Sequence, residues 1–90
     1  MVALDNSELL ELRKKIDALD KEMLSTLEER FELINDVARF KKKNGMPFRD
    51  LAREEEVIKS KYGLTELPED FVNRLFRLIM DEALKREEEN

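Results

Sequence analysis

Apolar residues recur along the first half of this 90-residue chain at spacings of three and four positions. The series consists of Leu12, Ile16, Leu19, Met23, Leu27, Ile34 and Val37. Such spacing is typical of a helix that buries one face. Because no proline or glycine occurs before Gly45, the pattern predicts one uninterrupted helix over residues 6–44. At about 1.5 Å per residue, this helix would be roughly 58 Å long.

Two further helices are expected, over residues 50–62 and 68–87. Asp50 is a suitable N-cap for the shorter one, and Gly63 marks its end. Pro68 suits the first turn of the other, because its missing N–H has no helical partner there. The sequence therefore predicts an all-α fold with one very long, one short and one medium helix.

The long helix is too large for its own chain to cover. A compact domain of this size has a radius of gyration of only about 12 Å. Two shorter helices cannot cover an apolar stripe of roughly 58 Å. We therefore expect a single domain over residues 1–90 that packs against a second copy as an intertwined helical homodimer.

Composition excludes several classes of function. Charged residues make up 43% and hydrophobic residues 41% of the chain, which is typical of helical proteins. The formal charge of −5 argues against nucleic acid as a partner. Cysteine and histidine are both absent, which removes disulfides, thiolate chemistry, the usual general base and the commonest metal ligand. No metal and no cofactor are expected.

The hydropathy pattern argues against a membrane location. No apolar run approaches the length of a membrane span. The first residues lack the basic and apolar regions of a signal peptide, so the expected location is the cytoplasm. Glutamine is absent while Glu and Lys are abundant, a bias that resembles proteins from hot environments.

Two cations interrupt the apolar stripe of the long helix. Arg30 lies between Leu27 and Ile34, and Lys41 follows Val37 by four residues. Arg30 and Lys41 are eleven residues apart, so they point in nearly the same direction and lie roughly 16 Å apart along the axis. A charge on a buried stripe is costly unless it is paired. The pattern therefore indicates a site for a small anion.

Simpler interpretations exist for each charged residue taken alone. Arg30 can be a core-edge arginine whose head reaches water. Lys41 can complement the helix dipole. Asp50 can be a cap only, Glu54 one more acid of a first turn, and Glu87 a solvated residue of an acidic tail.

The ordered pattern of charged and apolar residues resembles the all-helical chorismate mutases. The likeness covers nearly the whole chain. It is carried by residues 12–20, Glu29-Arg30, Lys41, residues 50–54 and residues 74–80. The resemblance implies rearrangement of chorismate to prephenate, on the branch of the shikimate pathway that leads to phenylalanine and tyrosine. This pericyclic reaction needs no nucleophile, base or cofactor.

The resemblance also implies a role for particular residues in a site shared between two subunits. Arg30 and Arg13 of the partner subunit would bind the two substrate carboxylates, because the planar arginine fork suits a carboxylate. Lys41 would contact the ether oxygen, where negative charge develops. Glu54 would accept the substrate hydroxyl, with Asp50 nearby. The remaining expected contacts are Arg53, which would support the carboxylate network, and the apolar wall of Val37 and Val57.

Two positions depart from the familiar pattern. Ala83 stands where many members have serine, so one hydroxyl contact with substrate is lost. Glu87 stands where those members have glutamine, and it can donate a hydrogen bond to the ether oxygen only when protonated. Some members, including the fungal type, carry glutamate at this place.

Two alternative functions and one question about partners remain open. The first is an isochorismate-pyruvate lyase of the same fold. The second is a catalytically weak helical module for dimerisation or regulation, which the departures at Ala83 and Glu87 would favour. The partner question is whether the chain works with a larger shikimate-pathway enzyme, because family members sometimes act as subunits or fused domains.

Overall fold

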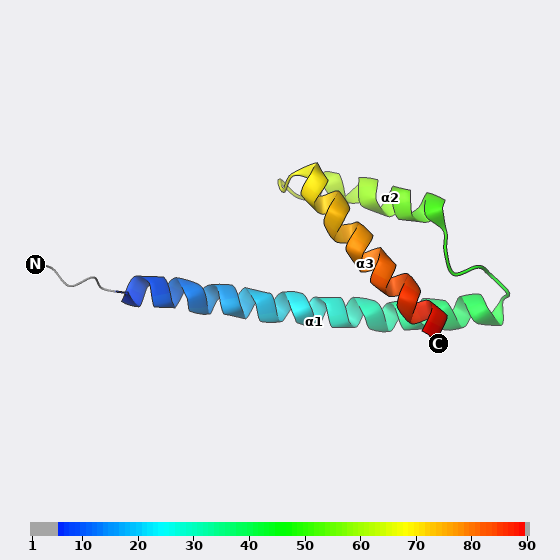
Figure 1. Cartoon of the computed structure of the whole chain (residues 1–90), viewed down its shortest axis with the longest axis horizontal. Helices are drawn as coiled ribbons and strands as arrows, with labels where there is room; N and C mark the ends of the chain where they lie inside the picture. The colour runs from blue at the N-terminus through cyan, green and yellow to red at the C-terminus, as the bar shows by residue number, and fades with distance from the viewer. Residues whose placement is uncertain (1–5, 90) are drawn as a thin grey trace, which may run out of the picture. The chain divides into compact units, whose positions relative to one another are not determined.

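The computed structural model describes residues 6–89 and consists of helices joined by short loops. The helices are α1 (Ser7–Lys43), α2 (Leu51–Tyr62) and α3 (Glu69–Glu89) (Figure 1). No strand occurs among these residues. The all-helical fold with one very long, one short and one medium helix is therefore confirmed. The ends of the predicted domain, residues 1–5 and 90, lie outside the described residues.

The boundaries of the helices follow from local sequence signals. Gly45 adopts a φ of 64°, a left-handed conformation that glycine adopts without strain. Asp50 caps α2, and its side chain accepts a hydrogen bond from the backbone N–H of Arg53 at 3.0 Å. The carbonyl of Pro68 accepts the first helical bond of α3, from the N–H of Val72 at 3.0 Å.

Contacts divide the chain into two compact units, Met1–Glu32 and Leu33–Asn90. In the second unit α2 packs against α3. Arg77 of α3 pairs with Glu55 of α2, and the amide of Asn73 donates to the hydroxyl of Tyr62 at 3.3 Å. Among residues 6–89, the buried hydrophobic residues belong to this unit and are Ala38, Ile58, Val72, Ile79, Met80 and Ala83.

The described part of the first unit is α1 up to Glu32, and it buries almost nothing within the single chain. Its apolar stripe remains exposed, with fractional exposures of 50% for Leu12, 56% for Ile16, 63% for Leu19 and 54% for Met23. The spacing therefore predicts which residues share a face, and a single chain provides no cover for them. None of the helices in residues 6–89 combines the length and apolar character that a membrane span requires.

Candidate active site

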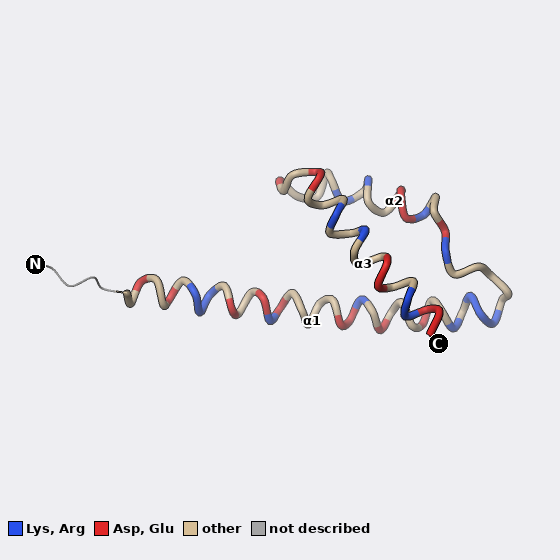
Figure 2. Tube along the Cα trace, viewed as in Figure 1, with Lys and Arg blue, Asp and Glu red and all other residues tan. Residues whose placement is uncertain are grey.

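Lys41 occupies the last turn of α1, where the end of the helix holds its backbone. The N–H of Met46 donates to the carbonyl of Lys41 at 2.8 Å, and the N–H of Gly45 donates to the carbonyl of Lys42 at 3.4 Å. These two bonds form a Schellman motif, which requires the left-handed conformation of Gly45. Figure 2 shows the run of lysines at this end of the helix, where cations complement the helix dipole.

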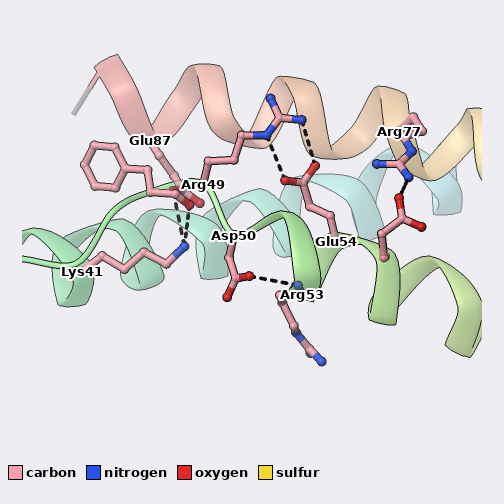
Figure 3. Close-up of polar contacts among 9 residues, drawn as sticks. Lys41, Arg49, Asp50, Arg53, Glu54, Arg77 and Glu87 are labelled. Atoms are coloured by element: carbon pink, nitrogen blue, oxygen red, sulfur yellow. Dashed lines mark hydrogen bonds and ion pairs between the residues drawn. The ribbon is translucent and has the colours of Figure 1, made fainter.

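The ammonium of Lys41 turns away from solvent, and only 18% of its side chain is exposed. Its Nζ atom donates to the backbone carbonyl of Phe48 at 2.7 Å. Figure 3 shows that this ammonium also faces the carboxyl group of Glu87 from α3. Lys41 therefore differs from a solvated lysine that only complements the helix dipole.

Glu87 is buried, with 5% of its surface exposed, so it is not a solvated tail residue. Its Oε2 atom lies 3.9 Å from Nζ of Lys41, which is an ion-pair distance but too long for a hydrogen bond. Burial raises the pKa of the Glu87 carboxyl above its ordinary value, because the charged form loses solvation. Lys41 opposes this pKa shift, and the neighbouring Glu88 adds to it. The net upward shift of the pKa extends to higher pH the range in which the Glu87 carboxyl is protonated and can donate a hydrogen bond.

Glu54 lies in the first turn of α2 with 16% of its side chain exposed. Both of its carboxylate oxygens are engaged by the guanidinium of Arg49. The Nε–Oε2 distance is 3.1 Å and the Nη2–Oε1 distance is 3.3 Å (Figure 3). The sequence interpretation missed Arg49. The available signal was an arginine next to the N-cap and five residues before a predicted site glutamate.

Asp50 and Arg53 lie close to this pair in the chain but have other contacts. The carboxylate of Asp50 accepts the N-cap hydrogen bond of α2, and the residue remains exposed. Arg53 pairs with Glu56 on the same helix, and 63% of its side chain is exposed. In Figure 3 the side chain of Arg53 points away from Lys41 and Glu87. In the free chain, Arg53 is therefore a surface residue.

The predicted apolar contacts differ in burial. Ala83 is buried with 6% exposure, and Val57 is half-buried. Val37 is 42% exposed, whereas its neighbour Ala38 is buried with 1% exposure. Within one chain, the face of α1 that enters the core is thus centred on the residue next to the predicted one.

Arg30 and Arg13 belong to the first unit. The Nη1 atom of Arg30 is buried and has no hydrogen-bond partner among the described residues. Burial lowers the pKa of the Arg30 guanidinium from its ordinary value. Arg13 is exposed in the single chain.

An open pocket of about 560 Å³ lies within the second unit. This volume is in the range of sites for small molecules. The pocket is lined by Lys41, Met46, Pro47, Arg49, Asp50 and Leu51. Lys41 and Arg49 place positive charge at this pocket and Asp50 places negative charge there, while Arg49 is itself paired with Glu54.

Comparison with known families and proteins gives a consistent result. The family model described as chorismate mutase type II matches residues 12–88. The chain is 37% identical over 79 residues to the bifunctional chorismate mutase/prephenate dehydratase of Escherichia coli strain K12, covering 84% of this chain and 20% of that protein. It is also 32% identical over 84 residues to the T-protein of Enterobacter agglomerans, covering 90% of this chain and 22% of that protein. The chain thus spans about a fifth of the length of these curated relatives.

Solved structures give the same picture at the level of the fold. A chorismate mutase (form II) from Thermus thermophilus superposes with a TM-score of 0.87 at 30% identity. The match covers 91% of this chain and 96% of that one. The form I structure from the same organism gives a TM-score of 0.81 at 28% identity, covering 86% of this chain and 99% of that one. The all-helical fold is therefore shared with these proteins.

Proposed function

This chain belongs to the chorismate mutase type II family, and we propose that it catalyses the rearrangement of chorismate to prephenate. The reaction breaks the ether C–O bond of the substrate and forms a C–C bond within the same molecule. It needs no nucleophile or base, which suits a chain without cysteine or histidine. Catalysis then consists of holding the reactive conformer and stabilising the negative charge that develops on the ether oxygen.

One observation carries this proposal. Among residues 6–89, the buried side-chain nitrogen and oxygen atoms without a hydrogen-bond partner are Nη1 of Arg30 and Oε2 of Glu87. Buried polar groups in proteins are nearly always paired, so an unpaired one calls for an explanation. A guanidinium N–H can be satisfied by a substrate carboxylate, and a protonated carboxyl by an ether oxygen. Within the second unit, the carboxyl of Glu87 faces Lys41 and provides the main support for the proposal, whereas Arg30 belongs to the first unit and is a separate assignment.

We assign to Lys41 and Glu87 the stabilisation of the negative charge that develops on the ether oxygen. The ammonium of Lys41 is held by the carbonyl of Phe48 and faces Glu87, so a cation and a raised-pKa carboxyl meet at one place. A pre-positioned donor costs no reorganisation when charge appears in the transition state. Glu87 contributes in its protonated form, since its ionised form would repel the developing charge.

The other assignments concern substrate binding. Arg30 binds one carboxylate, and Glu54 accepts the hydrogen bond of the substrate hydroxyl, with Asp50 beside it. The guanidinium of Arg53 joins the carboxylate network after leaving Glu56, a rearrangement that its exposure permits. The apolar wall consists of Val37, Val57 and Ala83.

We further propose that the protein works as a homodimer with shared sites. The exposed stripe from Leu12 to Met23 supports this, because a row of apolar residues on one helix face favours a partner surface. Arg13 of the partner subunit then supplies the second carboxylate contact. Sedimentation at micromolar concentration checks the assembly, and a well-folded monomer there would contradict it.

The deciding experiment follows the loss of chorismate by absorbance with the purified protein, in parallel with isochorismate. Turnover of chorismate to prephenate is expected. Release of pyruvate from isochorismate without prephenate formation would instead identify a lyase of the same fold. A cytoplasmic location and a larger shikimate-pathway partner stay predictions.

A further inference from the structure

Arg49 forms a bidentate ion pair with Glu54, and the proposed reaction assigns no role to Arg49. The two N–O distances are 3.1 Å and 3.3 Å, so the guanidinium grips both carboxylate oxygens. The glutamate is half-buried, with 16% of its side chain exposed, while the arginine is 46% exposed. The carboxylate is therefore more shielded from solvent than the guanidinium that pairs with it. A bidentate pair of this kind also fixes the orientation of the carboxylate plane.

The same short segment holds a second site residue. The carbonyl of Phe48 accepts a hydrogen bond from Lys41 at 2.7 Å, and the next residue is Arg49. Adjacent residues of the loop between α1 and α2 therefore contact both Lys41 and Glu54, which come from different helices (Figure 3). The loop itself is held at its ends by the Schellman motif at Gly45 and by the cap at Asp50.

We propose that Arg49 is a positioning residue that acts through Glu54, holding its carboxylate in the orientation that accepts the substrate hydroxyl. The inference rests on the proposed function, in which Glu54 has that role. Arg49 itself contacts no reacting atom.

Two physical effects give Arg49 this role. First, the fork of Arg49 limits the rotation of a long side chain, so less entropy is lost when substrate binds. Second, chorismate is a dianion, and an unpaired carboxylate beside it would repel it. A guanidinium on Glu54 compensates that charge and leaves further lone pairs free for the hydroxyl.

The first test replaces Arg49 by methionine, which keeps much of the length and removes the charge and the donors. The hydroxyl contact is made in the ground state as well as in the transition state. Arg49→Met should therefore raise KM about five- to tenfold, by analogy with loss of part of a charge-assisted hydrogen bond, and leave kcat within about twofold. Arg74→Met is the matched control, because that arginine pairs with Asp70 on the surface of α3. Its KM should equal that of the wild-type protein.

The second test is a double-mutant cycle with Glu54→Ala. If Arg49 acts through Glu54, Arg49→Met should raise KM no further in the Glu54→Ala background. An equal rise in both backgrounds would overturn the proposal, because it would mean that Arg49 binds substrate directly. An unchanged KM of Arg49→Met in the wild-type background would also overturn it.

Circular dichroism and thermal melting of each variant identify any loss of fold. If Arg49 only stabilises the fold, Arg49→Met should have a lower melting temperature and a lower kcat per total protein. This pattern would refute the proposal that Arg49 positions Glu54. Arg49→Lys keeps the charge but loses the fork, so a KM between those of Arg49→Met and the wild-type protein is expected. Absence of turnover by the wild-type protein would reject the proposed function as well, whereas normal turnover with an insensitive Arg49 rejects only this inference.

Discussion

Replacement of Glu87 by glutamine is expected to remove most of the pH dependence of catalysis. Glu87 is 5% exposed, and its Oε2 atom lies 3.9 Å from Nζ of Lys41. Because its pKa is raised, the carboxyl changes from a hydrogen-bond donor to a repelling carboxylate at a pH above the ordinary pKa of a glutamate. Activity of the wild-type protein should therefore be highest at acid pH and fall as pH rises through this pKa. Glutamine presents an N–H donor at every pH.

The magnitude follows from the protonated fraction. Above the pKa of Glu87 that fraction falls about tenfold per pH unit, and kcat should fall with it. At high pH, where Glu87 is fully ionised, kcat should level off at the value that Lys41 alone supports. Removal of one donor to a developing oxyanion costs roughly 10²–10³ in kcat, which sets the ceiling for the ratio of Glu87→Gln to wild type. At low pH, where both proteins carry a donor, the ratio should approach one.

The assay measures kcat for chorismate loss from acid to alkaline pH in the two proteins. Glu89→Gln is the control, because it removes an exposed acid from the same helix end. Its profile should match the wild-type profile. If Glu87→Gln and the wild-type protein have the same profile, Glu87 does not face the ether oxygen and Lys41 is the remaining donor.

Three further predictions concern the stability of the fold, the role of Lys41 and the sharing of the site between subunits. Folding raises the pKa of Glu87. Between the pKa of the unfolded state and that of the folded state, the folded state therefore binds more protons. The free energy of unfolding should fall as pH rises through this window. Urea unfolding across pH should show a steeper fall in the wild-type protein than in Glu87→Gln. Lys41→Ala should lower kcat, with a loss of about 2.7–4 kcal/mol in transition-state stabilisation. A normal kcat with only a raised KM would show that Lys41 is a binding residue. Arg13→Ala and Arg30→Ala should each be inactive but partly regain activity when mixed under subunit exchange; proven exchange without recovery would disprove the shared site.

The sequence by itself determined the helices and their ends. Helical periodicity, the glycine at Gly45, the cap at Asp50 and the proline at Pro68 are local signals, and each acts within a few residues of the chain. The observed helices differ from the predicted ranges by at most two residues at any end. Lys41 could also be singled out, because a cation on an apolar stripe is visible in the spacing alone.

Only the tertiary structure decided which charged side chains meet. Glu87 looks like part of an acidic tail in the sequence, yet packing of α3 buries it beside Lys41, far away in the chain. The pairing of Glu54 with Arg49 likewise depends on the path of the loop that precedes α2. The physical reason is that periodicity specifies the face on which a residue lies. The direction of a long side chain and its loss of solvent depend on what packs against that face.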